Sequence, residues 1–524
     1  MKKKIIFSLL AGTMLGVMPS CTDLDETVYD NLPADTFGST ETEVNALVGT
    51  VYKTLKSYVA DGNFIALDEY SGSSAVTPTR KGGDWYDGGQ YREIYMHTWT
   101  SQTSCIKGAW STASQAIGTC NANLTVVEAS TILSDAKKAQ LSAEIRGVRA
   151  FWIYKMMDEW GNVPLVVDYS DKELPTCQSR QTVYDWLVKE VTDIAEQCPD
   201  RQGNYTKFTK GAAYTLLAKL YLNAEAWGVG GAENYAKAIA ACDKVTSLGY
   251  ALNPDFKTNF AIANGDSPEA ILAAPFSETD TGKDNRWQMM NRTLHYKDQQ
   301  ALGNGVSAWN GVCAQPDYVK QFDTEDPRYK ATYLIGQMYV KGTQEEIITD
   351  HGFPLNHTVD VTMIAGTEYD GTNWGAVNQH DGARCWKWPL DSPSLTDAMG
   401  NDFYIFRYAD VLLMKAEALL RSGGSAAEAT SLVNQVRERA YGDASHNKAS
   451  VTLNDVMMER RFELAWEMHN RQDDIRFGVY GKGMWSASNC DRKTDEYLKL
   501  FPVSQDAFQS NDKLTQNPGY PAFK

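Results

Sequence analysis

The chain has 524 residues, of which 43% are hydrophobic, and a formal net charge of −16 at pH 7. This composition is too apolar for a disordered chain, and the excess negative charge disfavours binding to nucleic acid or another polyanion. A chain of this length can bury a sizeable core, either as one large domain or as two closely packed ones.

The N-terminus has the layout of a secretory signal peptide. Three lysines precede an apolar run from Ile5 to about Val17, and small residues follow before Cys21. The run is too short for a permanent membrane span. Since Cys21 stands where bacterial lipoproteins carry their lipidated cysteine, we predict a signal peptide over residues 1–20 and a lipid on Cys21, with a plain secretory signal as the alternative. No later apolar run reaches the length of a span, so we expect anchorage by lipid.

A stretch rich in glycine follows in TRKGGDWYDGG, residues 79–89. Two glycine pairs flank Asp84, Trp85, Tyr86 and Asp87. Because paired glycines permit positive φ and tight reversals, the block is predicted to be a protruding turn that exposes its two rings.

Helical periodicity dominates two regions of the chain. Apolar residues recur every three or four positions, and glycine or proline ends several of the segments. The predicted helices span residues 134–160, 182–198, 207–226, 234–248, 408–421 and 426–441. The alanine-rich pairs at 207–248 and 408–441 resemble the helical hairpins of tetratricopeptide repeats.

Between about residues 253 and 403 the sequence changes to short segments punctuated by Gly, Asn, Asp and Pro. We predict a loop-rich region here, and loops on a rigid frame commonly carry binding surfaces. Trp287, in GKDNRWQMMNR, and Trp309, in GNGVSAWNG, have polar and glycine neighbours like those of Trp85.

A charged block near the C-terminus raises the possibility of a glycoside hydrolase, which needs two carboxylates across an open cleft. Its acids alternate with arginines at helical spacing, which favours a structural ion network. The block comprises Glu459, Arg460, Arg461, Glu463, Glu467, Arg471, Asp473, Asp474 and Arg476. Signatures of serine hydrolases, zinc proteases and nucleotide-binding loops are lacking. We therefore expect no catalytic residues.

Cysteine and histidine spacing suggests neither a metal nor a cofactor. Eight cysteines besides Cys21 are scattered without a CxxC pair, and the seven histidines show no ligand spacing. Cys105 and Cys120 could form a disulfide, although buried free thiols are the simpler expectation.

Several segments together resemble one family. They are AEIRGVRA from Ala143 continuing to WGNVPLV at Trp160, FRYADVLLMKAEALL from Phe406, VNQVRERAYG from Val433, MERRFELAWEMHNRQDDIRFG from Met458, and LFPVSQDAFQSNDKLTQNPGY from Leu500. In this order they are similar to the conserved blocks of the SusD/RagB family of outer-membrane lipoproteins. The acidic stretch after Cys21 also resembles the signal that carries some lipoproteins to the outer cell surface.

This resemblance implies a mostly α fold, in which tetratricopeptide-like hairpins pack against an irregular loop-rich region. It divides the mature chain into an N-terminal part, residues 21–252, and a C-terminal part, residues 253–524. It further implies a lipid-anchored protein on the outer surface of the outer membrane that delivers oligosaccharide or polysaccharide to a SusC-like TonB-dependent transporter, without catalysis. Some relatives take peptides instead, and that alternative stays open.

A neutral glycan would be held by flat rings beneath its C–H faces and by polar groups at its edge. Stacking on a nucleobase contributes about 1–3 kcal/mol per ring, and we expect a sugar ring to gain no more. The predicted ligand-binding residues are Trp85, Trp287, Trp309, Tyr86, Asp84, Asp87, Arg80 and Asn310. Separated tryptophans would suit a long, flat chain such as a plant β-glucan hemicellulose.

Overall fold

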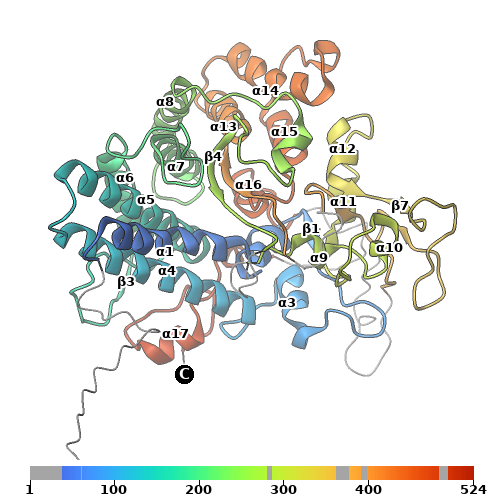
Figure 1. Ribbon diagram of the computed structural model, residues 1–524, viewed down its shortest axis with the longest axis horizontal. Coiled ribbons are helices and arrows are strands. Elements are labelled where there is room, and N and C mark those ends of the chain that lie inside the picture. Colours follow the sequence, from blue (N-terminus) through green and yellow to red (C-terminus); the bar gives the residue numbers. More distant parts are fainter. Residues whose placement is uncertain are drawn as a thin grey trace, which may run out of the picture.

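The computed structural model describes residues 38–60, 62–279, 286–361, 377–390, 398–482 and 494–523. Long helices fill one side of the molecule, and short helices and strands joined by loops fill the other (Figure 1). The fold is mostly α, which confirms the predicted class. Across these ranges, every helix is too short or too polar to cross a membrane.

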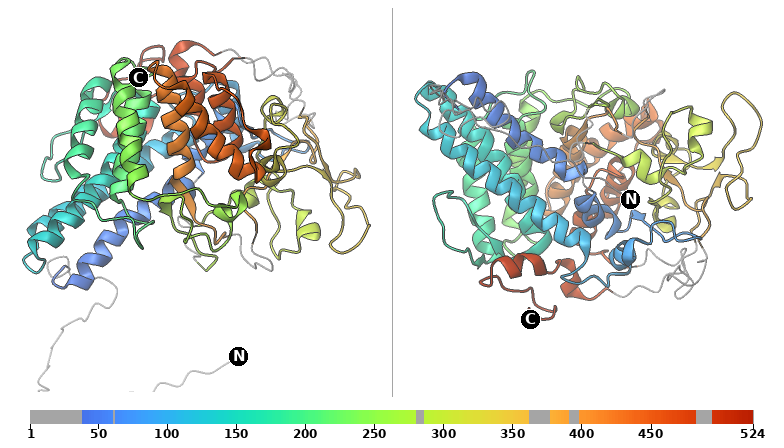
Figure 2. Two further views of the ribbon diagram at one scale, coloured as in Figure 1. Left: turned by 90° about the horizontal axis from the view of Figure 1, so that it is seen from above. Right: turned by 60° about the horizontal axis from the view of Figure 1, so that its bottom comes forward.

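Eight helices form the regular side of the molecule. They are α1 (Glu41–Ala60), α4 (Ser104–Ala129), α5 (Asp135–Trp160), α6 (Arg180–Ile194), α7 (Lys210–Asn223), α8 (Glu233–Ser247), α13 (Tyr408–Arg421) and α14 (Ala426–Tyr441). Each helix from α4 to α8 packs on the next, α13 packs on α8, and α14 packs on α13 (Figure 2). The late hairpin therefore continues the series begun by the early ones, across the loop-rich stretch that separates them in sequence.

Local sequence explains where these helices begin and end. The Ser134 side chain accepts a hydrogen bond from the backbone N–H of Lys137 at the start of α5, and Gly161 ends that helix at φ 70°. Ser425 caps α14 in the same way. The predicted bounds of α13 and α14 are confirmed to the residue, whereas α6 begins two residues before the predicted start, because Ser179 is its N-cap.

The remaining elements are short. The helices are α2 (Asn63–Ile65), α3 (Gln90–Met96), α9 (Met289–Thr293), α10 (Asp298–Leu302), α11 (Pro316–Val319), α12 (Pro327–Thr332), α15 (Leu453–Leu464), α16 (Asn470–Arg476) and α17 (Gln505–Ser510). The antiparallel strand pairs are β1 (Ala75–Val76) with β5 (Cys313–Ala314), β2 (Val163–Pro164) with β3 (Cys177–Gln178), β4 (Ala270–Ala274) with β10 (Phe403–Arg407), β6 (Tyr333–Leu334) with β9 (Arg384–Cys385), and β7 (Gly336–Gln337) with β8 (Asn356–His357).

One hydrophobic core runs through both sides of the molecule. The buried pair β4–β10 lies within it, and Phe406 of β10 meets Phe151 of α5 with ring centroids 6.1 Å apart. Cys105 and Cys120 are buried free thiols, in agreement with the simpler expectation. The core fixes the helical frame against the loops that carry the candidate site.

A buried acid makes stability depend on pH. Glu69 is fully buried, and burial raises the pKa of its carboxyl to about 7, above the usual 4.5. Because the folded-state pKa is the higher one, the stabilisation is fully present below pH 4.5 and is lost as the pH rises through 7. We expect wild type to lose about 3 kcal/mol more than Glu69→Gln between pH 4 and 8. Urea unfolding at each pH measures this difference.

Glu173→Gln is the control for this titration, since the Glu173 side chain is 86% exposed. The control should follow wild type at every pH. Parallel curves for wild type and Glu69→Gln would mean that the pKa of Glu69 is the same in the folded and unfolded protein.

Candidate functional site

The glycine-rich block at residues 79–89 forms a tight turn. Gly82, Gly83, Gly88 and Gly89 all have positive φ, between 67° and 94°. The backbone N–H of Gly83 donates to the Arg80 carbonyl, and the N–H of Arg80 donates to the Asp84 carbonyl. The predicted reversal is therefore confirmed. Trp85 itself has φ 61°, which is uncommon for a residue with a large side chain.

Trp85 and Trp309 come together from loops more than 200 residues apart. The indole Nε1–H of Trp85 donates to the Trp309 backbone carbonyl at 2.6 Å. A Cβ on Gly311 would lie 2.3 Å from the Trp85 ring, so glycine permits this close approach. Both residues are half-buried. The Trp85 ring packs beside Tyr91 with ring centroids 5.3 Å apart, and the Arg292 guanidinium lies 5.8 Å from the centroid of the Trp309 ring. We call these two residues the tryptophan pair.

Arg80 holds the loops of the tryptophan pair in place. Its guanidinium is fully buried and donates to the backbone carbonyls of Asn310 at 2.9 Å and Gly311 at 3.1 Å. It also donates to the carbonyls of Asn378 at 2.9 Å and Asp381 at 2.8 Å. The prediction that Arg80 contacts ligand is wrong, because its donors join its own loop to two others.

Asn310 is also placed differently from the prediction. Its side chain is fully buried and interacts with the Asp84 carboxylate. A bound glycan cannot reach this amide in the present arrangement, so the predicted role at the edge of a ligand is wrong. Its backbone, at φ 58°, instead turns the loop behind Trp309.

The other predicted ligand-binding residues, Asp84, Tyr86 and Asp87, differ in their exposure to solvent. Asp87 is exposed, and the Tyr86 side chain is 37% exposed. Asp84 is half-buried. Burial raises the pKa of the Asp84 carboxyl, and Arg80 partly offsets this effect. These three residues remain candidates for contact with a ligand.

Trp287 lies in the core, and its predicted role as an exposed ring is wrong. Its side chain is 2% exposed and stacks on Phe276 with ring centroids 5.8 Å apart. The edges of Trp388 and Phe403 pack around it at 4.9 and 5.5 Å. Its polar neighbours at residues 280–285 lie outside the described ranges. Polar flanking residues therefore do not decide which way a ring points.

Trp287→Ala is expected to lower the free energy of unfolding by about 3–5 kcal/mol, because it leaves a ring-sized cavity in the core. Trp309→Ala is the matched control, since Trp309 is half-buried, and we expect it to cost a smaller amount. Urea unfolding of both variants measures the difference. Equal losses would show that Trp287 is not a core residue.

Phe353 is an exposed ring near the site that the sequence analysis did not identify. Its side chain is 45% exposed and packs beside His380 with ring centroids 5.8 Å apart. His380 is followed by Asp381, whose carbonyl accepts from Arg80. The preceding residue, Gly352, has φ 81°. The same signal that marked Trp85, a glycine at a turn beside a ring, would therefore have found Phe353.

The acids of the C-terminal block are buried ion partners. Glu463 contacts Arg407 at 2.7 Å and Arg328 at 2.9 Å, and it is also paired with Arg439. Glu467 contacts Lys387 at 2.5 Å. These carboxylates are almost fully buried, so no substrate can reach them. The predicted structural ion network is confirmed.

A second group of acids satisfies the geometry of a metal site but is neutralised by the protein. Asp68, Asp158 and Glu159 offer oxygens within 4.8 Å of one another. The Lys155 ammonium lies 2.8 Å from Asp68 and 2.9 Å from Glu159, and Arg471 lies 2.9 Å from Glu159. Because these cations occupy the position between the acids, the group fits an ion cluster better than a metal centre.

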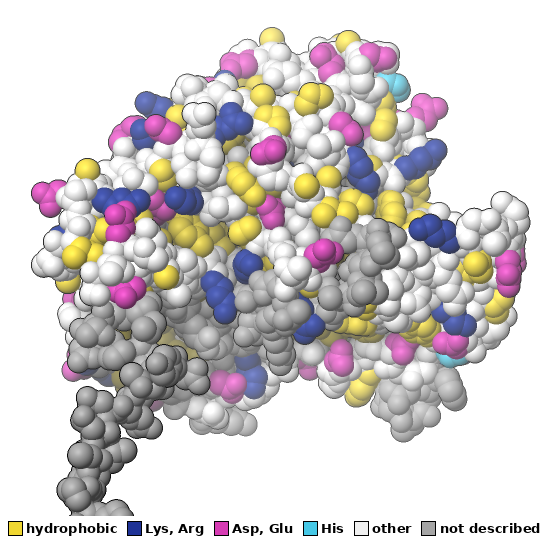
Figure 3. Space-filling view, viewed as in Figure 1, with side chains coloured by type: hydrophobic (Ala, Val, Ile, Leu, Met, Phe, Trp, Pro, Cys, Tyr) yellow, Lys and Arg dark blue, Asp and Glu magenta, His cyan; other side chains and the backbone are white. Residues whose placement is uncertain are grey.

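Charged side chains of both signs are intermixed on the face seen in Figure 3, and apolar side chains lie between them. Among the described residues of this face, the basic side chains form no continuous patch.

Two family profiles match the sequence. Residues 24–222 match the profile described as "Starch-binding associating with outer membrane", and residues 268–520 match the SusD family. Among known proteins, a SusD-like protein of Bacteroides ovatus is 26% identical, with 92% of this chain and 83% of that protein covered. The starch-binding protein SusD of Bacteroides thetaiotaomicron is also 26% identical, with 74% of each covered.

Solved structures share the fold. A laminarin-binding SusD-like protein superposes with a TM-score of 0.72 at 22% identity, with 92% of this chain and 100% of that chain covered. Surface glycan-binding protein A from Bacteroides thetaiotaomicron, in complex with laminarihexaose, gives 0.68 at 17% identity, with 91% and 99% covered. At these identities the likeness establishes the architecture of the chain.

Proposed function

Since the chain belongs to the SusD family, we propose that it is a surface protein that binds oligosaccharide or polysaccharide and delivers it to a SusC-like TonB-dependent transporter. Its relatives are named as binding proteins. Like them, the chain binds its ligand without catalysing a reaction. The names of those relatives favour a glycan over a peptide as the ligand.

The observation that carries this proposal is the tryptophan pair on its fastened loops. Two half-buried tryptophans from distant segments are joined by the hydrogen bond from the Trp85 indole to the Trp309 carbonyl. Flat rings of this kind can stack on the C–H faces of a pyranose, and Asp84, Asp87 and Tyr86 supply polar groups beside them. We also assign Phe353 to this surface, because it packs next to the loop that Arg80 holds.

We further propose that the protein is anchored in the outer membrane by a lipid on Cys21, with residues 1–20 removed as a signal peptide. Cys21 lies outside the described residues, so the proposal rests on the sequence. The family profile that names association with the outer membrane supports it.

A binding screen tests the proposed ligand class. Purified protein is titrated by calorimetry with starch, laminarin, a β-glucan hemicellulose and a set of short peptides. We expect one class of glycan to bind with micromolar to millimolar affinity, corresponding to about −8 to −4 kcal/mol, without release of reducing ends. Binding of peptides alone would replace the glycan with a peptide ligand, and release of reducing ends would reveal an enzyme.

Co-purification tests the proposed partner. After mild detergent extraction of outer membranes, the tagged protein is expected to bring down a TonB-dependent transporter. Recovery of the protein without any such transporter would contradict the delivery role.

A further inference from the structure

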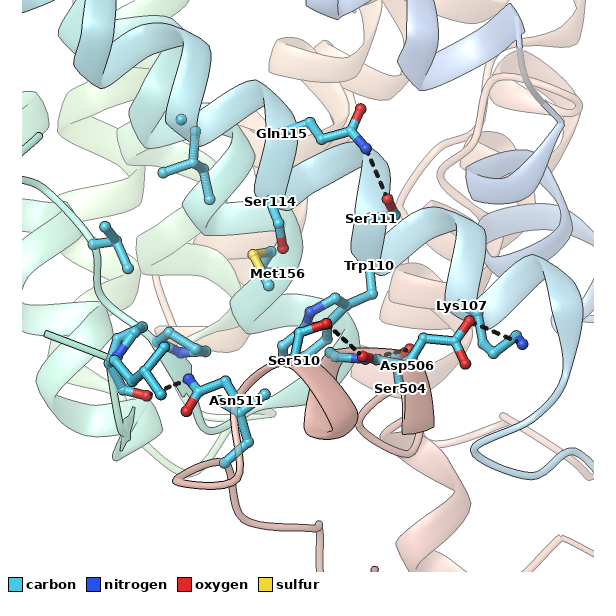
Figure 4. A pocket seen from close by; sticks show the side chains of 18 residues that line it. Lys107, Trp110, Ser111, Ser114, Gln115, Met156, Ser504, Asp506, Ser510 and Asn511 are labelled. Carbon is cyan, nitrogen blue, oxygen red and sulfur yellow. Dashed lines mark hydrogen bonds and ion pairs between the residues drawn. The ribbon is translucent and has the colours of Figure 1, made fainter. Parts of the chain in front are cut away.

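A cavity of about 480 Å³ shares no residue with the tryptophan pair. Helix α4, helix α17 and the segment between β2 and β3 line it (Figure 4). Its volume is in the range of sites that enclose small molecules.

The cavity exists because one face of α4 carries small side chains. Ser111, Ser114 and Gly118 follow one another at helical spacing along the lining. A Cβ built on Gly118 meets no atom within 4 Å, so open space begins at this position. Larger residues on this face would fill the gap between α4 and α17.

Two polar contacts hold the walls of the cavity together. The Lys107 ammonium lies 2.9 Å from the Asp506 carboxylate and joins α4 to α17. The Asn511 side-chain amide donates to the Pro175 carbonyl at 2.8 Å and joins the end of α17 to the β2–β3 segment. The two charged groups of the lining therefore already neutralise each other.

The interior of the cavity is mostly apolar. Its apolar lining comprises Trp110, Ile117, Met156, Pro164, Val166, Leu174, Pro175, Ala507 and Leu514. Leu174 is 46% exposed at the mouth, an apolar group left in contact with water. A glycan carries a hydroxyl on most ring carbons, and the apolar part of the lining, which is the larger part of its surface, would leave the hydroxyls that face it without partners.

Trp110 adds one specific polar group. Its side chain is 5% exposed and packs edge-on against Trp160, with ring centroids 5.2 Å apart. Its indole N–H donates no hydrogen bond to any described residue. Because the Trp110 side chain lines the cavity, its N–H is available to a molecule bound there.

We propose that this cavity binds an uncharged aromatic molecule that carries a hydrogen-bond acceptor. The ring of the ligand packs between Trp110, the Met156 thioether and the aliphatic side chains, since thioethers and aromatic rings attract one another. The acceptor takes the hydrogen bond of the Trp110 N–H. A charged ligand is disfavoured because Lys107 and Asp506 are already paired, so its charge would lose hydration without gaining a partner.

The test uses the full-length mature protein and three naphthalene probes. Prodan, a neutral fluorescent ketone, reports entry into an apolar site by a blue shift of its emission. Displacement of Prodan by 2-acetylnaphthalene and by 2-ethylnaphthalene then compares two molecules of nearly equal shape, of which only the first has an acceptor. We expect saturable binding of Prodan and about three- to ten-fold tighter binding of the acetyl compound, the usual contribution of one neutral hydrogen bond.

Two variants locate the probe. Gly118→Trp places a large side chain in the open space of the mouth and is expected to weaken Prodan binding at least ten-fold. Gly49→Trp is its matched control, because Gly49 is also an exposed helical glycine whose Cβ would meet no atom within 4 Å. Trp110→Phe keeps a ring but removes the N–H, and it is expected to abolish the preference for the acetyl compound.

Three results would overturn the proposal. They are the absence of saturable Prodan binding to wild type, equal binding to wild type and Gly118→Trp, and displacement of Prodan by a glycan that binds the tryptophan pair. If Trp110→Phe does not fold, as judged by circular dichroism, the comparison of Gly118→Trp with Gly49→Trp still decides the matter. Loss of glycan binding in Trp85→Ala leaves this test unaffected, so the two proposals can fail separately.

Discussion

Glu463→Gln is expected to lower the free energy of unfolding by about 3–5 kcal/mol, the usual cost of breaking a buried ion pair by removing one partner. Glu463 is fully buried and contacts the guanidinium groups of Arg328, Arg407 and Arg439. These cations lower the pKa of its carboxyl despite its burial. The glutamine has nearly the same volume, so the loss reports the missing charge rather than a cavity. Urea unfolding followed by circular dichroism measures it.

The exposed variant Glu173→Gln serves as the reference for this experiment. Glu173 pairs with Lys513 at 3.4 Å on the surface, where an ion pair contributes about 0–1 kcal/mol. If Glu463→Gln unfolds at the same urea concentration as Glu173→Gln, the ion network does not stabilise the fold as proposed.

Trp85→Ala and Trp309→Ala are each expected to weaken glycan binding by about ten-fold or more. Each change removes one stacking ring, and such a ring contributes about 1–3 kcal/mol on a nucleobase. Trp85→Ala also removes the hydrogen bond to the Trp309 carbonyl, so we expect it to have the larger effect. Calorimetry with the best glycan of the screen measures both variants.

Two further variants make this result specific. Trp85→Phe keeps a ring and loses the N–H, so binding should fall less than in Trp85→Ala. Tyr169→Ala removes a ring that is 52% exposed on the β2–β3 segment, away from the candidate site, and should bind as wild type does. Normal binding by both tryptophan-to-alanine variants would place the glycan elsewhere on the protein.

The sequence predicted the helices with strong local signals. In α13 and α14, continuous apolar spacing and the Ser-Gly-Gly turn defined both bounds correctly. Helices α1 and α4 were not predicted, although each is 20 residues or longer. Their sequences contain glycine and threonine at several positions, and these residues have low helix propensity. Packing on α5 provides the stabilisation that local sequence does not.

The candidate site was predictable only in part, because burial depends on contacts that are distant in sequence. Local glycines located the turn around Trp85 correctly. Trp287 has similar neighbours, yet the rings of Trp388 and Phe403 enclose it from more than 100 residues away. Arginine is likewise a residue type usually found at the surface, yet Arg80 is buried by its contacts with the loops at residues 310 and 378–381. No local sequence pattern specifies these long-range contacts.

The position of Arg80 has a kinetic implication for ligand capture. Because one guanidinium already joins its own loop to two others, the tryptophan pair is preorganised, and little loop entropy remains to be lost when a ligand binds. A glycan can then associate without waiting for a rearrangement, and a weak complex formed in this way dissociates quickly. Rapid exchange of this kind suits a receptor that releases each molecule it captures.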